Sequence, residues 1–157
     1  MRSARQVADR RAPAAPRGYG AEGPGALALL LPQPPFNAAL TSLDISENFL
    51  FGSKPLHDQV PDGPRKQLPD QEQGGWRRLC AALPETCVSE LVVQEIGLGR
   101  QGADILAATM AAAAANAEQP GGKPLRLRNV DLRRNEALSV GYLAQFEDPE
   151  KNLLVRH

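Results

Sequence analysis

The sequence predicts an α/β solenoid, with a curved parallel sheet inside, helices outside and about three to four repeated units. A nine-residue frame with apolar residues at its first, fourth and sixth positions occurs three times, at 40–48, 88–96 and 127–135. Glycines recur after the frame, and leucines follow these glycines at helical spacing. Because internal repeats turn a short chain into stacked units with one shared core, this pattern predicts the architecture.

The glycines explain why the three copies are unequally spaced. Gly102 and Gly141 each lie six residues after the ninth frame position. The matching glycine of the first copy is Gly75, which comes 21 residues late. Without this insertion, the step from Leu43 to Leu91 shortens from 48 to 27 residues, which is within the roughly 20–29 residues typical of a strand-and-helix repeat. The next step, of 39 residues, has its excess in an alanine run and a Pro-Gly-Gly break.

Each unit is therefore expected to be a short strand, a turn with glycine and an amphipathic helix. Leucine follows glycine by four residues in three places, at Gly25, Gly75 and Gly102, which is helical spacing. The apolar run 26–31 fits the helix of the first unit, and it is too short for a membrane span of about 20 residues.

The segments 40–48, 98–106 and 130–135 resemble the ribonuclease-inhibitor type of leucine-rich repeat, which also occurs in NOD-like receptors and Ran GTPase-activating proteins. The likeness covers residues 22–146. It implies that the ninth-position asparagine lies inside the solenoid and bonds the backbone of neighbouring turns. Asn48 and Asn135 match this pattern, whereas Ile96 interrupts it and Gln145 replaces the expected helix leucine.

Two stretches depart from the repeat. Residues 1–20 form a basic arm with five arginines and one acid, for which we expect disorder, with organelle targeting as the alternative. Residues 21–157 form the repeat domain, interrupted at 51–74 by a proline-rich insertion without apolar periodicity. Such composition predicts an exposed loop, either disordered or used for docking, whose removal (53–73) leaves the fold intact.

Composition limits the function classes. Basic and acidic residues number 18 each, so no net charge favours nucleic acid or an anionic membrane. Cys80 and Cys87 are too few for a disulfide-stapled fold and are expected as reduced core thiols in a cytoplasmic protein. A zinc site with His57 lacks ligand spacing, and His57-Asp58 has no nucleophile. We therefore predict no enzyme activity, cofactor or metal.

The residues between the apolar frame positions are expected to face outward from the sheet. Stacking the copies in register aligns Asp44, Val92 and Asp131 in one column. The next two columns are Ser46, Gln94 and Arg133, and Glu47, Glu95 and Arg134. The predicted partner-binding residues are Asp44, Ser46, Glu47, Gln94, Glu95, Asp131, Arg133 and Arg134. This face runs from acidic to basic along the stack. Either a partner matches this gradient, or lateral pairs such as Glu95 and Arg134 are ordinary solvated contacts.

Three function classes follow: a leucine-rich-repeat interaction module, such as a fragment or diverged short member; a GTPase-activating protein of the Ran type; and a structural subunit of a larger assembly. The first is favoured, because solenoid sheets are common binding surfaces.

At the carboxyl end, residues 152–155 are expected to begin another strand, with Leu154 at the fourth frame position. An uncovered apolar strand there predicts association with another protein or with a second copy.

Overall fold

The computed structural model describes residues 23–55, 65–135, 137–138 and 154–156 of the 157-residue chain. Helices α1 (Gly23–Leu30) and α2 (Phe36–Ala39) come before strand β1 (Ser42–Asp44). The remaining elements, in order, are β2 (Ser53–Pro55), β3 (Arg65–Gln67), α3 (Gly74–Ala82), a 3-10 turn at Leu83–Glu85, β4 (Glu90–Val92), α4 (Arg100–Ala117), β5 (Asn129–Asp131) and β6 (Leu154–Arg156).

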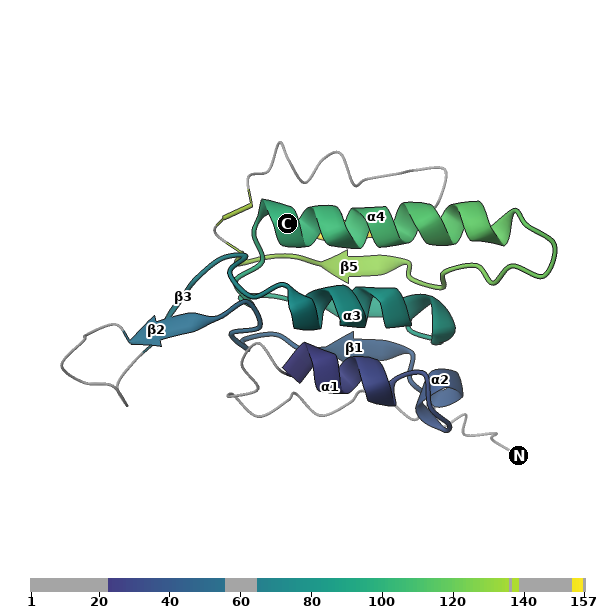
Figure 1. Cartoon of the computed structure of the whole chain (residues 1–157), viewed down its shortest axis with the longest axis horizontal. Helices are drawn as coiled ribbons and strands as arrows, with labels where there is room; N and C mark the ends of the chain where they lie inside the picture. The colour runs from purple at the N-terminus through teal and green to yellow at the C-terminus, as the bar shows by residue number, and fades with distance from the viewer. Residues whose placement is uncertain (1–22, 56–64, 136, 139–153, 157) are drawn as a thin grey trace, which may run out of the picture.

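Four strands form one parallel sheet in the order β1-β4-β5-β6. Helices α1, α3 and α4 lie side by side along this sheet (Figure 1). Helix α3 lies between β1 and β4 in the chain and α4 lies between β4 and β5, so each of these two crossovers places the next strand beside the previous one. The coarse prediction of an α/β fold with a parallel sheet is confirmed.

The register of the first three strands follows the predicted frame. Leu43 lies opposite Leu91, and Leu91 lies opposite Val130, so the fourth frame position forms one column. These three side chains are at most 2 % exposed. The sixth-position side chains are equally buried, because alternation along a strand sends both positions to the helix side.

The turn after each of these strands has the same backbone. The eighth frame residue has a positive φ in all three copies: 58° at Glu47, 51° at Glu95 and 63° at Arg134. Glutamate and arginine rarely adopt this left-handed region, so the recurrence is a property of the repeat rather than of the residue type. The ninth residues, Asn48, Ile96 and Asn135, are all buried.

Part of the core lies where α3 meets α4. Trp76 is fully buried, packs at 5.6 Å from the ring of Phe51, and donates from Nε1 to the carbonyl of Gly102 at 2.8 Å. A Cβ on Gly102 would lie 2.8 Å from Phe51 and 2.6 Å from Leu98, so only glycine allows this close approach. Trp76 is thus a packing anchor beside Gly75, in the first turn of α3.

The prediction of a plain exposed loop at 51–74 is wrong for both ends of that stretch. Strands β2 and β3 pair antiparallel. The segment after β3 returns to the repeat, where Asp70 N–H donates to Gly97 O and Glu72 N–H donates to Phe51 O. Counting apolar periodicity missed these contacts because they use backbone groups and one carboxylate.

The structure also corrects the predicted register of the carboxyl-terminal strand. Residues 154–156 do form a strand, but Val155 rather than Leu154 lies opposite Val130, one residue later than expected.

The alanine run 111–115 extends α4 and is largely exposed, as expected of a helix of high propensity and little burial. None of the helices in the described part of the chain is long and apolar enough to cross a bilayer. The arm 1–20, His57-Asp58, Gly141 and Gln145 lie outside the described residues.

Candidate functional site

The sheet side chains that alternate with the core residues form the candidate binding face. Its columns match the predicted ones, since Asp44 lies opposite Val92, and Val92 lies opposite Asp131. Glu47, Arg133 and Arg134 are exposed. Asp44, Ser46, Gln94 and Glu95 are partly exposed, whereas Asp131 is only 7 % exposed and is the one predicted site residue that is buried.

Arg134 contacts both other side chains at the eighth frame position, Glu47 and Glu95. Its guanidinium lies 3.6 Å from the Glu47 carboxylate and also forms an ion pair with Glu95. The predicted lateral pairing of Glu95 with Arg134 is therefore confirmed. The three side chains are between 40 % and 59 % exposed, so solvent screens the pairs and each contributes only about 0–1 kcal/mol.

Asp131 is buried because Arg133 and Gln94 cover it. The Arg133 guanidinium donates from Nε and Nη2 to the two carboxylate oxygens at 2.9 and 2.7 Å, and Gln94 Nε2 donates at 2.8 Å. Burial by itself raises the pKa of Asp131. The hydrogen bonds and the charge of Arg133, together with the Gln94 bond, outweigh burial and hold this pKa below its usual value.

Asp44 repeats part of this arrangement on β1. Its Oδ1 accepts the Ser46 N–H at 3.0 Å, as Asp131 Oδ1 accepts the Arg133 N–H at 3.2 Å. Ser46 Oγ in turn accepts the Gln94 N–H at 3.1 Å. These local bonds stiffen the turns that present the face.

The predicted charge gradient is present along the stack, but neighbouring units compensate much of it. Acidic Asp44 and Glu47 lie on the β1 side, and Arg133 and Arg134 lie on the β5 side. Both arginines already bind carboxylates of this chain. Such a face presents ordered polar groups of both signs. Among the described residues, no three His, Cys, Asp or Glu side chains come together as metal ligands.

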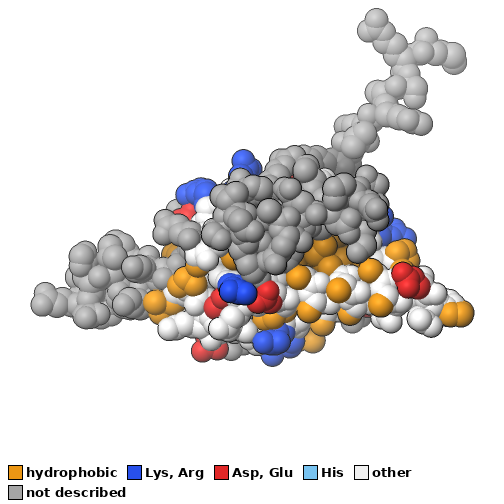
Figure 2. Space-filling view, turned by 90° about the horizontal axis from the view of Figure 1, so that it is seen from above, with side chains coloured by type: hydrophobic (Ala, Val, Ile, Leu, Met, Phe, Trp, Pro, Cys, Tyr) orange, Lys and Arg blue, Asp and Glu red, His pale blue; other side chains and the backbone are white. Residues whose placement is uncertain are grey.

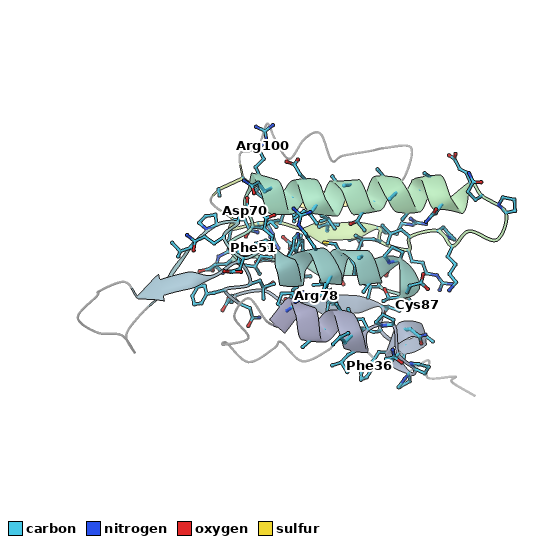
Figure 3. All side chains as sticks on the ribbon, viewed as in Figure 1. Phe36, Phe51, Asp70, Arg78, Cys87 and Arg100 are labelled. Atoms are coloured by element: carbon cyan, nitrogen blue, oxygen red, sulfur yellow. The ribbon has the colours of Figure 1, made fainter. Side chains whose placement is uncertain are left out.

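Sequence reasoning missed Asp70, which lies at the amino end of α4 near Phe51 and Arg100 (Figure 3). Its carboxylate accepts the N–H groups of Gly99 and Gly102, each at 3.0 Å, and of Gln101 at 2.8 Å. Helix starts require acceptors for such groups. The sequence signals this cap only indirectly. Gly97-Leu-Gly99, directly before α4, has no side chain that can accept the first N–H groups of the helix, so a side-chain acceptor has to come from another segment.

The two cysteines differ. Cys80 is fully buried, and burial raises the pKa of its thiol far above the usual range, so it is a protonated core side chain as predicted. Cys87 is only partly buried and contacts Arg126 Nη1 at 3.0 Å, so the expectation of two core thiols holds for Cys80 alone.

Comparison with protein-family models, curated proteins and solved structures found no match.

Proposed function

We propose that this chain is a leucine-rich-repeat interaction module of the ribonuclease-inhibitor-like type, which binds a protein partner through the sheet face opposite the helices. The observation that carries the proposal is the repetition of one backbone: three frames in register, each with a left-handed eighth residue and a buried ninth residue. In a solenoid of this kind the sheet face is concave and extended, which suits protein recognition.

The face offers a partner charged groups that are already held in place. Arg133 and Arg134 are 50 % and 59 % exposed, and their contacts with Asp131, Glu47 and Glu95 fix their positions before binding. A partner with carboxylates toward β5 and cationic groups toward Asp44 fits this arrangement. Such complementary charges set specificity and association rate more than affinity. A cytoplasmic location is part of the proposal, in keeping with the unpaired cysteines.

The GTPase-activating alternative is less well supported by these contacts. An arginine that acts in GTP hydrolysis must bring its guanidinium to the transferring phosphate. Arg133 and Arg134 both bind carboxylates of this chain. Assay of GTP hydrolysis by purified small GTPases separates the alternatives, since an interaction module leaves the rate unchanged.

Binding is tested by capture from native lysate with two matched charge changes. Arg133→Ala/Arg134→Ala alters the sheet face, and Arg77→Ala/Arg78→Ala removes the same charge from exposed positions on α3. We expect the first pair to reduce capture of a reproducible partner about tenfold or more, the scale of one lost interfacial contact, and the second pair to leave it unchanged. Capture that depends on the α3 arginines alone would place the interface on the helix layer. A structural subunit would give co-purification that neither pair changes.

A further inference from the structure

Strands β2 and β3 form a separate two-stranded ribbon, which extends away from the helices and the main sheet (Figure 1). Among the described strands, these two pair only with each other. A sheet of two short strands is only marginally stable in water, whereas three or more strands can be stable. The antiparallel register pairs Ser53 with Gln67, Lys54 with Lys66, and Pro55 with Arg65.

Backbone bonds next to both strands fix the base of the ribbon to the repeat domain. Leu68 N–H donates to Gly52 O, and Glu72 N–H donates to Phe51 O, both at 3.1 Å. Phe51 is fully buried, and Asp70 accepts three N–H groups at the start of α4. A strand that adds to the ribbon therefore meets an edge that is already held in place, which lowers the entropic cost of binding.

The bond from Leu68 to Gly52 shows which backbone groups of the ribbon point outward. In an antiparallel pair, hydrogen-bonded positions alternate with positions whose N–H and C=O groups point away from the partner strand. Because Gly52 and Leu68 are bonded, the backbone groups of Lys54 and Lys66 also face each other across the ribbon. The backbone groups that point to the two open edges are those of Ser53, Pro55, Arg65 and Gln67.

The two open edges are not equivalent. On β2, Pro55 has no N–H, so Ser53 supplies the one outward donor of this strand. Proline at such a position protects an edge strand from further pairing. On β3, Arg65 and Gln67 each present an N–H and a C=O, the groups to which an added strand bonds. Strand addition is therefore favoured at the β3 edge.

Charge determines which kind of strand fits this edge. The two strands contain three cationic residues, Lys54, Arg65 and Lys66, and no acidic residue, although the whole chain has 18 of each sign. Lys54 and Lys66 are direct cross-strand partners, and like charges at such positions destabilise a strand pair. A second copy of β3 would bring further cations to this edge. An acidic strand offsets the repulsion instead.

We propose that the β3 edge is a strand-addition site, at which an extended acidic segment of a partner protein pairs with Arg65–Gln67. The backbone groups of Arg65 and Gln67 supply affinity, and carboxylates beside Lys66 supply selectivity. This edge is separate from the sheet face of the repeats, so the inference does not depend on the proposed function.

A labelled synthetic peptide tests strand addition to the full chain. The probe has about six residues, a usual strand length, in which glutamate alternates with valine, and lysine replaces glutamate in the control peptide. We expect fluorescence anisotropy to show saturable binding of the acidic peptide alone. Hydrogen exchange should then slow at the amides of Arg65 and Gln67, and the Lys66 amide, which faces β2, should not change. Equal binding of both peptides, or no binding of the acidic peptide, would overturn the proposal.

Two proline variants separate strand addition from simple charge attraction. Gln67→Pro removes an outward N–H of β3, whereas Ser53→Pro removes the outward N–H of β2. We expect the first to weaken binding of the acidic peptide about fivefold or more, as for one lost hydrogen bond, and the second to leave it unchanged. Lys66→Glu should weaken binding to a similar extent. A loss in Lys66→Glu without a loss in Gln67→Pro means that charge alone attracts the peptide, which rules out strand addition.

The sheet face supplies the last control, because it also presents arginines. Arg133→Ala/Arg134→Ala should leave binding of the acidic peptide unchanged, even if it reduces capture of a partner from lysate. Peptide binding that is lost in this variant and kept in Gln67→Pro would place the acidic segment on the sheet face and overturn the proposal. Circular dichroism and the fluorescence of Trp76, which is buried in the core, verify that each variant is folded.

Discussion

Replacing Asp70 by alanine should destabilise the whole domain, although Asp70 lies in a loop that the sequence pattern marks as dispensable. A capping side chain that accepts one backbone N–H contributes about 0.5–2 kcal/mol. Asp70 accepts three. Water can replace the exposed bond to Gln101, but Gly99 and Gly102 would be left with part-buried donors. We therefore expect a loss of about 2–3 kcal/mol in the free energy of unfolding.

The conformation of Asp70 provides a second comparison. Its φ is 57°, a region that costs alanine roughly 1 kcal/mol and glycine almost nothing. Asp70→Gly should therefore be about 1 kcal/mol less destabilising than Asp70→Ala, because only the lost hydrogen bonds remain. Gln71→Ala, at the exposed next residue, is the control and should change stability by less than about 0.5 kcal/mol.

Urea unfolding, followed by helical circular dichroism and by the fluorescence of Trp76, measures these differences. Trp76 is the only tryptophan, is fully buried and bonds the first turn of α4, so its signal reports the affected region. An Asp70→Ala midpoint equal to that of Gln71→Ala would refute long-range capping of α4.

Three further predictions test the core, the helix contact and the binding face. Leu91→Asp should abolish cooperative unfolding, because it buries an unpaired charge in the middle strand, whereas Val92→Asp on the opposite face should melt as a folded domain. Thermal melts of both variants check the register. Gly102→Ala should cost about 1–3 kcal/mol through overpacking, while Gly74→Ala, whose added methyl contacts only the end of an arginine 3.8 Å away, should be neutral or slightly stabilising in the same assay. The lowered pKa of Asp131 means that its contribution to stability is present above the ordinary aspartate pKa of about 3.9 and is lost as pH falls below it. Asp131→Asn should therefore unfold at a lower urea concentration at pH 7 and show a smaller further loss on acidification than the unmodified chain.

The sequence predicted the repeated strand well because its signal is local. Apolar side chains at the fourth and sixth frame positions share one face, as alternation along a strand requires, so Leu43, Leu91 and Val130 could be aligned without a structure. The left-handed residues could not be found in this way. Glu47, Glu95 and Arg134 are not the residue types that mark a positive φ, and only the preserved turn geometry reveals them.

Contacts over long sequence distances account for the other differences. Asp70 caps a helix that begins 30 residues later, and no local pattern links the two. The burial of Asp131 likewise depends on Gln94 from the neighbouring strand. The last strand was misplaced by one residue because its frame has three consecutive apolar residues, at 153–155, and the prediction chose Leu154 rather than Val155 for the fourth position.

Hydrogen exchange of the chain with and without its captured partner tests the binding proposal most directly. We predict slower exchange at the turns after β1, β4 and β5, where residues 46–48, 94–96 and 133–135 border the sheet face. The outer surface of α4 should not change; Figure 2 looks onto the α4 side of the molecule and shows hydrophobic side chains scattered among the described residues, together with several charged groups of both signs. Protection confined to α4, with the three turns unchanged, would contradict binding through the sheet.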